Sequence, residues 1–173
     1  MSTSRTLQYS KAFPPKKDQD GKYLCRWCDK VLSGRATSFC STACTDEALI
    51  RCWPSHARKL VFKRDKGVCG ACGLDTVKAE TIIKAHAKEV HGPMVPCWGN
   101  NMRQMRGSEA VELFLNLKRG NRRTLWEANH ILPVIEGGGA CGLDNFETLC
   151  LWCHRDHTKE LRARMAQAKK ARP

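Results

Sequence analysis

Closely spaced cysteine pairs are the residues of this sequence best suited to bind a metal. Cys25-x-x-Cys28 is followed, after eleven residues, by Cys40-x-x-x-Cys44. A C-x-x-C turn lets two thiolates converge on one zinc ion at about 2.3 Å each, and a second pair completes the tetrahedron. The spacing therefore predicts a four-cysteine zinc site. A redox C-x-x-C motif is the alternative, but no thioredoxin-like βαβ pattern surrounds these residues.

A second set of pairs, Cys69-x-x-Cys72 and Cys150-x-x-Cys153, is separated by seventy-seven residues. Each pair offers only two thiolates, so we join them by elimination into a second zinc site. Four thiolates leave no open coordination position, and both zinc ions are therefore expected to be structural. For the three remaining cysteines we expect small, buried apolar roles rather than ligation. These are Cys52, Cys97 and Cys141.

The amino terminus bears on the choice between zinc and disulfides. Met1–Lys17 has no apolar signal-peptide region, and no run of eighteen apolar residues occurs in the sequence, so nothing suggests secretion or a membrane span. The reducing interior of a cell keeps thiols from forming disulfides and therefore favours zinc binding by these cysteines. We expect an intracellular protein, cytoplasmic if its source is a bacterium or phage and nuclear if it is a eukaryote.

A His–Asn–His pattern lies in the last third of the chain. Leu125-Trp-Glu-Ala-Asn-His-Ile-Leu-Pro leads through Gly137-Gly-Gly to Leu143-Asp-Asn-Phe-Glu-Thr-Leu-Cys-Leu-Trp-Cys-His154. This segment resembles the HNH endonuclease motif, with His130, Asn145 and His154 at the first His, middle Asn and last His. The resemblance implies a ββα-metal fold that hydrolyses phosphodiester bonds of DNA.

The frame of the resemblance is wider than the motif itself. It begins at Cys40-Ser, includes Gly67-Val-Cys-Gly-Ala-Cys and continues toward the carboxyl end. This arrangement is similar to the HNH module at the end of a eukaryotic annealing helicase that remodels stalled replication forks. Compact bacterial HNH proteins share it.

The resemblance implies a role for each residue of the motif. His130 is the general base that takes a proton from water, a task that a neutral imidazole near pH 7 suits. Asn145 pins the connecting loop through its amide and orients the base. His154 binds a catalytic divalent cation, such as Mg²⁺ or Mn²⁺, which stabilises the leaving oxygen and the added phosphate charge. His157, three residues along the same helix face, is a further candidate ligand or a phosphate contact.

One position departs from the family pattern. Such families usually place Asp before the catalytic His as a metal ligand, and here that residue is Asn129. An amide oxygen contributes no charge, so metal affinity should fall unless Glu127, on the same strand face, compensates. This departure keeps open a zinc-dependent nucleic-acid-binding module with weak or no catalysis. An adaptor that binds proteins through the amino-terminal zinc site is a third reading.

The charge of the chain favours a polyanionic partner. The formal net charge is +13, which two four-thiolate zinc sites would lower to roughly nine. Residues 102–123 hold six Lys and Arg against two acids, residues 154–173 hold seven against two, and residues 124–153 hold none against four acids. We expect a cation site framed by basic segments that face DNA, although RNA would suit the same charge and a solvated basic surface is the alternative. The candidate phosphate contacts are Arg119, Arg122, Arg123, Arg155, Lys159 and Arg162.

Capping residues and periodicity predict the elements that position these sites. The class expected is a small α+β protein stapled by zinc, with an HNH ββα core. Trp126 and Trp152 flank the motif and should pack against it rather than stack on bases. Surface or core roles are expected for His56, His86 and His91. Helices are predicted from Ser41 or Thr42 to Cys52, over Ser55–Arg64, from Thr76 or Glu80 to His91, from Ser108 through Lys118 and from His154 to Ala171, with strands at Thr124–His130 and Phe146–Leu149.

A chain of 173 residues has room for one domain or two small ones. Residues 1–23 have no hydrophobic period and are predicted to form a flexible basic arm. A four-cysteine zinc finger with its following helices should occupy residues 24–66. We expect the HNH nuclease domain with the second zinc site over residues 67–160, and a basic helix or tail over residues 161–173.

Overall fold

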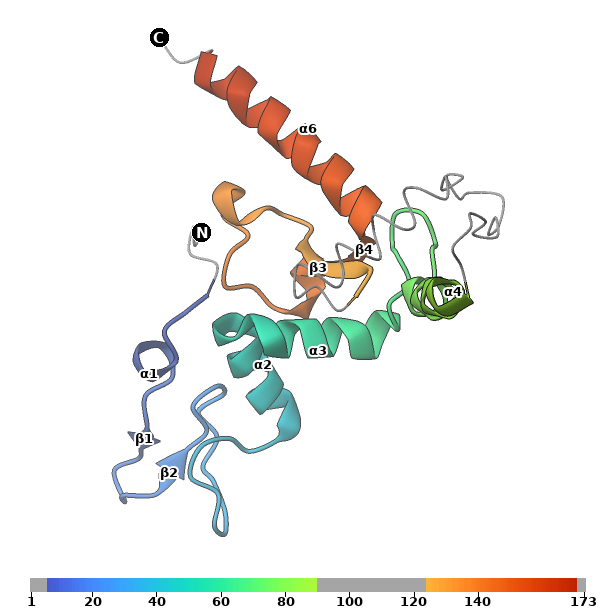
Figure 1. The fold of residues 1–173 in the computed structure, drawn as a ribbon. Coiled ribbons are helices and arrows are strands. Elements are labelled where there is room, and N and C mark those ends of the chain that lie inside the picture. Colours follow the sequence, from blue (N-terminus) through green and yellow to red (C-terminus); the bar gives the residue numbers. More distant parts are fainter. Residues whose placement is uncertain (1–5, 90–123, 171–173) are drawn as a thin grey trace. The chain divides into compact units, whose positions relative to one another are not determined.

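The computed structural model describes residues 6–89 and 124–170 (Figure 1). The chain divides into two compact units. Unit 1 comprises the described residues within Met1–Arg64 and His130–Glu147, and unit 2 those within Asp65–Asn129 and Thr148–Pro173. Helices, short strands and two four-cysteine clusters confirm the predicted mixed α+β class. The predicted domain boundaries stay a prediction.

Unit 1 begins with helix α1 (Tyr9–Ala12) and a short antiparallel hairpin of β1 (Lys16–Lys17) and β2 (Tyr23–Leu24). Phe13 is only 7% exposed and packs in one cluster with Ala48 and Cys52. The expectation of a flexible arm therefore fails for residues 6–22. The apolar residues of this segment are too irregularly spaced to show a period, yet they fill a core.

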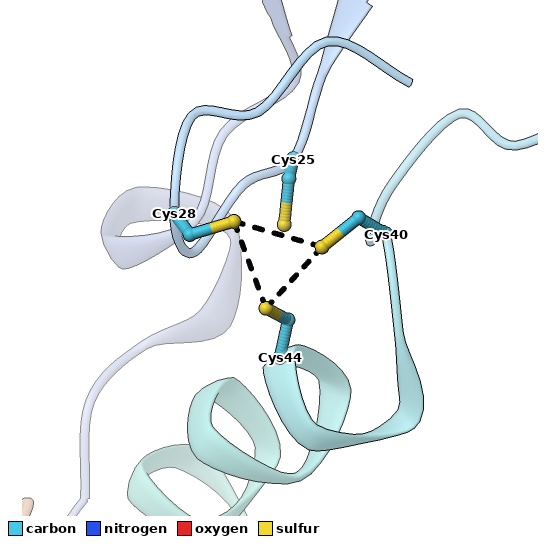
Figure 2. A group of neighbouring side chains, drawn as sticks. All are labelled: Cys25, Cys28, Cys40 and Cys44. Atoms are coloured by element: carbon cyan, nitrogen blue, oxygen red, sulfur yellow. Dashed lines mark hydrogen bonds between the residues drawn. The ribbon is translucent and has the colours of Figure 1, made fainter. Parts of the chain in front are cut away.

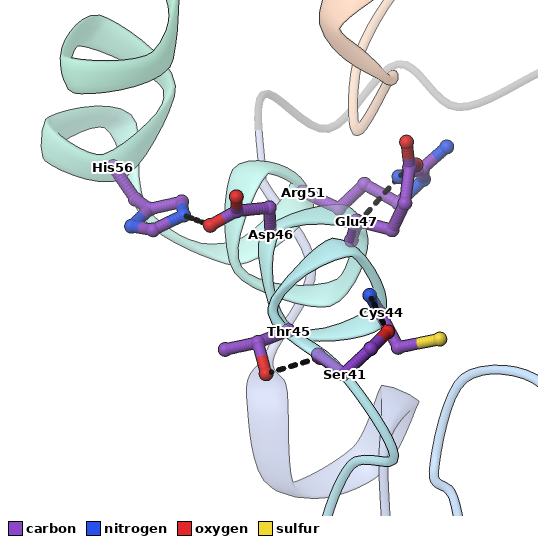
Figure 3. Close-up of polar contacts among 7 residues, drawn as sticks. All are labelled: Ser41, Cys44, Thr45, Asp46, Glu47, Arg51 and His56. Atoms are coloured by element: carbon purple, nitrogen blue, oxygen red, sulfur yellow. Dashed lines mark hydrogen bonds and ion pairs between the residues drawn. The ribbon is translucent and has the colours of Figure 1, made fainter.

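Helices α2 (Thr42–Cys52) and α3 (Pro54–Asp65) follow and confirm the two helices predicted here. The hydroxyl of Ser41 accepts a hydrogen bond from the backbone N–H of Cys44 at 3.2 Å, which caps α2 (Figure 3). Pro54 occupies the first position of α3, where its missing N–H costs no helical hydrogen bond.

Charged side chains of these two helices pair with one another. Along α2, Arg51 donates to Glu47 Oε2 at 2.6 Å, a pairing four residues apart (Figure 3). Nε2 of His56, on α3, donates to Oδ1 of Asp46, on α2, at 2.8 Å. His56 therefore joins two helices, in agreement with the structural role expected for it.

Unit 2 contains helix α4 (Thr76–Glu89), whose first turn is capped by Asp75 Oδ1, the acceptor of the Lys78 N–H at 3.0 Å. Of the two predicted start residues, Thr76 is correct. The hydroxyl of Thr76 is buried and donates to Gly67 O at 2.7 Å. The predicted helix end at His91 and the predicted helix from Ser108 through Lys118 lie outside the described residues.

Strands β3 (Trp126–His130) and β4 (Phe146–Cys150) form a two-stranded sheet, and helix α6 (Leu151–Lys170) follows at once (Figure 1). This ββα arrangement confirms both predicted strands. Helix α6 begins three residues before the predicted start, His154. The connection between the strands holds two short 3-10 helices, η1 (Val134–Glu136) and η2 (Leu143–Asn145).

The core of unit 2 combines residues of α4, β4 and α6 with Leu125, which precedes β3, and with residues of the Cys69–Leu74 turn. Trp126 is buried and Trp152 packs against the core cluster, which confirms the packing role predicted for both. The carboxylate of Glu80, on α4, accepts the backbone N–H of Leu125. The buried members of the cluster are Cys69, Leu74, Ala79, Leu125, Leu149, Cys150 and Leu151.

Candidate active site and metal sites

The first cysteine cluster gathers Cys25, Cys28, Cys40 and Cys44, whose sulfur atoms lie within 4.8 Å of one another (Figure 2). The Sγ–Sγ distances are 3.6 Å for Cys28 and Cys40, 3.5 Å for Cys40 and Cys44, and 3.7 Å for Cys28 and Cys44. In a tetrahedral site with Zn–S bonds of about 2.3 Å, two sulfur atoms are about 3.8 Å apart. The spacing of this cluster therefore fits a zinc ion.

The second cluster unites Cys69, Cys72, Cys150 and Cys153, again within 4.8 Å of one another. This finding confirms the pairing that the sequence supported only by elimination. The sulfur atoms of Cys72 and Cys150 are 3.8 Å apart, which is the edge expected of a zinc tetrahedron. In both clusters the structure brings together the four residues predicted.

The two C-x-x-C turns have the same backbone. In each, the first cysteine donates its N–H to a carbonyl five residues on, and its own carbonyl accepts the N–H of the fourth following residue. That residue has a left-handed backbone in both, Asp29 with φ 59° and Gly73 with φ 71°. The hydrogen bonds are Cys25 N–H to Lys30 O (2.8 Å), Cys69 N–H to Leu74 O (2.9 Å), Asp29 N–H to Cys25 O (2.9 Å) and Gly73 N–H to Cys69 O (2.8 Å).

The thiols of each cluster differ in their tendency to ionise. A hydrogen bond from Cys150 lowers the pKa of Cys69 to about 4, and the same pairing raises the pKa of Cys150. Burial opposes ionisation of Cys25, but backbone N–H groups outweigh it and lower the pKa to about 6. Burial raises the pKa of Cys153 to about 12. Four thiolates at this spacing need a cation to offset their charge, so the donor set fits zinc.

The cysteines outside the clusters behave as small side chains. Cys52 is buried in the core of unit 1, as predicted, and burial raises the pKa of its thiol. Cys141 is half-buried and belongs to neither cluster. Cys97 lies outside the described residues.

The loop between the strands is closed by Asn145. Ile131, directly after His130, donates its N–H to Asn145 O at 2.9 Å. The Oδ1 atom of Asn145 accepts the Leu132 N–H at 2.8 Å, and its Nδ2 donates to Leu132 O at 3.2 Å and to Gly138 O at 3.0 Å. One side chain thus holds both ends of the turn that follows His130.

Gly138 allows this close approach. A Cβ atom there would lie 1.8 Å from Leu132 O and 2.8 Å from Asn145 Nδ2. No larger residue fits without moving the loop backbone. The Gly137-Gly-Gly run therefore has a steric reason at its second position.

The His130 ring lies at the end of β3 and packs against a buried aromatic side chain. Its centroid is 4.4 Å from that of the Phe146 ring, with the two planes inclined by 45°. Phe146 is itself buried, so it offers a fixed surface to the imidazole. Contacts on both its ring and the backbone that follows it hold His130 in place.

The residues predicted to hold the catalytic cation lie on β3 and α6. Asn129 is only 8% exposed, while Glu127, His154 and His157 are half-buried. Within the described ranges, groups of three or more His, Cys, Asp and Glu close enough to share an ion are limited to the two cysteine clusters. Glu127, His154 and His157 do not form such a group, and their ligand roles stay predictions.

Basic side chains mark one face of α6. Arg155, Lys159 and Arg162 are exposed, and their spacing of four and three residues places them on the same side of the helix. Arg119, Arg122 and Arg123 lie outside the described residues.

Arg64, at the end of α3, contacts the same loop, although nothing in the sequence singles it out. Its Nη1 donates to Leu143 O at 2.9 Å and its Nη2 to Phe146 O at 2.6 Å. These contacts join residues 79 and 82 positions apart. No local pattern signals a pairing at that separation.

Comparison with known proteins decides the family. Residues 117–160 match the family described as HNH endonuclease, and this range contains His130, Asn145 and His154. The chain carries an HNH endonuclease domain. The predicted resemblance is confirmed, and the ββα core at residues 126–170 is the fold of this HNH domain.

The HNH chain is also a distant homologue of larger proteins. It is 30% identical over 174 residues to the DNA annealing helicase and endonuclease ZRANB3 of Mus musculus, covering 93% of this chain and 15% of the relative. The ZRANB3 proteins of Bos taurus and Homo sapiens are 27% and 30% identical over 93% and 86% of this chain, and 15% and 14% of their own lengths. The chain thus spans about 15% of the curated relatives it matches. No solved structure matches it significantly.

Among the helices of residues 6–89 and 124–170, none combines the length and the apolar character that crossing a bilayer requires.

Proposed function

We propose that this protein is a metal-dependent endonuclease that hydrolyses phosphodiester bonds of DNA, with His130 as general base on water. The observation that carries the proposal is the closed loop directly after His130, in a segment that matches the HNH endonuclease family. An endonuclease needs its base held in one orientation, because misplacement by about 1 Å can lower a rate about a hundredfold. Asn145 and Phe146 supply that constraint.

The first step is proton transfer from water to the imidazole of His130. A half-buried, neutral imidazole is a suitable acceptor near pH 7. The water that loses the proton attacks phosphorus, and the sugar oxygen on the opposite side of the phosphate leaves. Asn145 takes no proton in this scheme and acts by holding the loop.

Asn129 and His154 are proposed to hold the catalytic divalent cation. An amide oxygen and an imidazole nitrogen are both accepted donors for divalent ions, so the chemistry of this pair fits. When bound, such a cation stabilises negative charge on the phosphate and on the leaving oxygen. Glu127 and His157 are the next candidates as ligands.

The two cysteine clusters are proposed to bind one structural zinc ion each. Their four sulfur donors leave no position for water or substrate, so neither takes part in hydrolysis. Arg155, Lys159 and Arg162 are proposed to contact DNA phosphates from α6, together with Arg119, Arg122 and Arg123. Binding through these residues should weaken as salt rises, because it displaces counterions from the phosphates.

A second function is favoured by a specific observation. Asn129 replaces the Asp that such families usually place before the catalytic His, and in the part of the chain that the structure describes the acidic and histidine side chains do not gather into a group of three. On this reading the protein is a zinc-dependent module that binds nucleic acid with little or no catalysis. Both functions predict salt-dependent DNA binding, but only the first predicts cleavage.

Incubation of purified protein with supercoiled plasmid separates the two. We expect Mg²⁺ or Mn²⁺ to produce nicked or linear plasmid, and reactions without a divalent cation to leave the plasmid supercoiled. Salt-dependent retention of DNA without cleavage under any cation would favour the binding module. Loss of both cleavage and DNA retention would favour the adaptor reading.

Metal titration of the same reaction tests the cation site. Asn129→Asp adds a negative ligand, so the divalent concentration that gives half-maximal cleavage should fall, while His154→Ala should raise it. All three proteins are compared on one DNA at fixed pH and ionic strength. If only His154→Ala shifts the curve, Asn129 is not a ligand and Glu127 or His157 is tested next. If neither variant shifts it, the cation assignment is wrong.

A further inference from the structure

We propose that Arg64 is a positioning residue for His130, and that its guanidinium fixes the turn from which Asn145 and Phe146 hold the general base. The proposal rests on the proposed nuclease function. Arg64 lies on α3, outside the segment of residues 117–160 that matches the HNH family. The HNH site of this chain would therefore depend on a helix that the HNH match does not include.

The guanidinium donates hydrogen bonds to the turn on both sides of Asn145. Its two terminal nitrogens donate to separate carbonyls, Nη1 to Leu143 O at 2.9 Å and Nη2 to Phe146 O at 2.6 Å. Hydrogen bonds from a charged donor are shorter and stronger than those between neutral groups. Asn145 lies between the two acceptors, so Arg64 holds the backbone around Asn145 independently of the contacts that the Asn145 side chain makes.

The turn then holds His130 by two routes. Along the backbone, Asn145 O accepts the N–H of Ile131, the residue that follows His130, at 2.9 Å. Through side chains, the Phe146 ring lies 4.4 Å from the imidazole. Rotation or displacement of the turn would therefore move both the chain after the base and the ring that packs against it.

The geometry requires arginine rather than any positive charge. A guanidinium presents several N–H donors in a rigid plane and can serve two acceptors without rearrangement. A lysine ammonium is a compact charge on a flexible stem and is not preorganised to reach both carbonyls. Arg64 is also an exposed residue by its overall accessibility, so its replacement opens no cavity in a core.

The test compares three variants of the full chain, Arg64→Gln, Arg64→Lys and Lys59→Gln. Lys59 is exposed on the same helix, so Lys59→Gln removes the same charge as Arg64→Gln and serves as the matched control. Zinc content and thermal unfolding establish that each variant is folded. The readouts are kcat and KM for cleavage of one DNA duplex, and hydrogen exchange at the backbone amide of Leu132, which donates to Asn145.

We expect Arg64→Gln to lower kcat about tenfold or more, with KM changed less than twofold, because the base is displaced while DNA binding persists. Arg64→Lys should recover only part of kcat. Exchange at Leu132 should be faster in Arg64→Gln and unchanged in Lys59→Gln, whose kcat should equal that of the wild type.

Three outcomes would overturn the proposal. Wild-type kcat and Leu132 exchange in folded Arg64→Gln would remove the positioning role and leave the nuclease intact. Full recovery of kcat in Arg64→Lys would reduce Arg64 to a source of charge. If the wild type itself cleaves no DNA under any divalent cation, the proposed function fails, and the role of Arg64 toward a catalytic His130 fails with it.

Discussion

The two cysteine clusters begin with C-x-x-C turns of the same backbone conformation, but they differ in how far along the chain the other two cysteines lie. In each turn, the residue after the second cysteine has a left-handed backbone, Asp29 in the first cluster and Gly73 in the second. In unit 1 the completing cysteines lie 12 and 16 residues beyond Cys28, whereas in unit 2 Cys72 meets Cys150 across 78 residues. The first cluster is a local fold of one segment, and the second joins two remote segments.

Burial follows the same division. Cys28 and Cys40 are exposed, Cys44 is half-buried and Cys25 is buried, but the core cluster of Phe13, Ala48 and Cys52 includes none of these four ligands. In unit 2, Cys69 and Cys150 are each 1% exposed and belong to the hydrophobic core itself. Four cysteines thus lie outside the Phe13 core cluster in unit 1, whereas two of the four ligands in unit 2 are part of its core. Removal of a ligand should therefore have unequal consequences.

The largest effect is expected from Cys150→Ser. A structural zinc contributes roughly 10–16 kcal/mol, which matches or exceeds the roughly 5–15 kcal/mol that stabilises a typical domain. Because Cys150 belongs to the core, unit 2 should lose cooperative unfolding, and zinc should fall from two ions per chain toward one. Metal analysis and thermal unfolding measure both, with Cys141→Ser as a control that should keep both ions. A cooperative transition and two ions in Cys150→Ser would contradict the long-range role.

A smaller effect is expected from Cys44→Ser. Zinc should again fall from two ions toward one, but the core around Phe13 and Ala48 contains no cysteine ligand and should persist. Loss of structure should be confined to residues 25–44. Limited proteolysis followed by mass spectrometry locates the cleavage sites. Cuts spread through α3 would mean that the first cluster, too, supports its whole unit.

The smallest effect is expected at the shared turn. Gly73→Ala places a side chain on a backbone with φ 71°, which costs about 1 kcal/mol, although open space surrounds the new Cβ atom. Both zinc ions should remain bound. Gly73→Asn should recover part of the loss, because Asn tolerates this conformation as Asp29 does in the first turn. Denaturant unfolding measures the difference, and equal stability of wild type and Gly73→Ala would refute the parallel between the turns.

Local signals carried the sequence predictions that proved correct. The cap at Ser41 placed the start of α2, and cysteine spacing placed both C-x-x-C turns. These features act over a few residues, where chain geometry leaves few alternatives. The start of α6 was predicted three residues late, because Leu151 and Trp152 follow β4 without a capping residue or turn.

Packing between remote segments could not be predicted in the same way. Leu7, Tyr9 and Phe13 show no helical or strand period, and their burial depends on the surface that α2 offers them. At the candidate site, the resemblance implied loop contacts for Asn145. The structure adds the steric need for Gly138 and the two hydrogen bonds that Arg64 donates to the loop backbone. The hydrogen bonds of Arg64 go to two backbone carbonyls, and every residue has one, so the residue types at these positions could not predict the contact.

The most direct test of the central claim is cleavage of one plasmid by wild type, His130→Ala and His56→Ala at equal zinc content. His56 pairs with Asp46 in the same unit and is the matched control. We predict that His130→Ala lowers the cleavage rate by about 10²–10⁴-fold, because a general base contributes that much, while its DNA affinity stays close to wild type. His56→Ala should keep its rate. Undiminished cleavage by His130→Ala would contradict the assignment of the HNH active site.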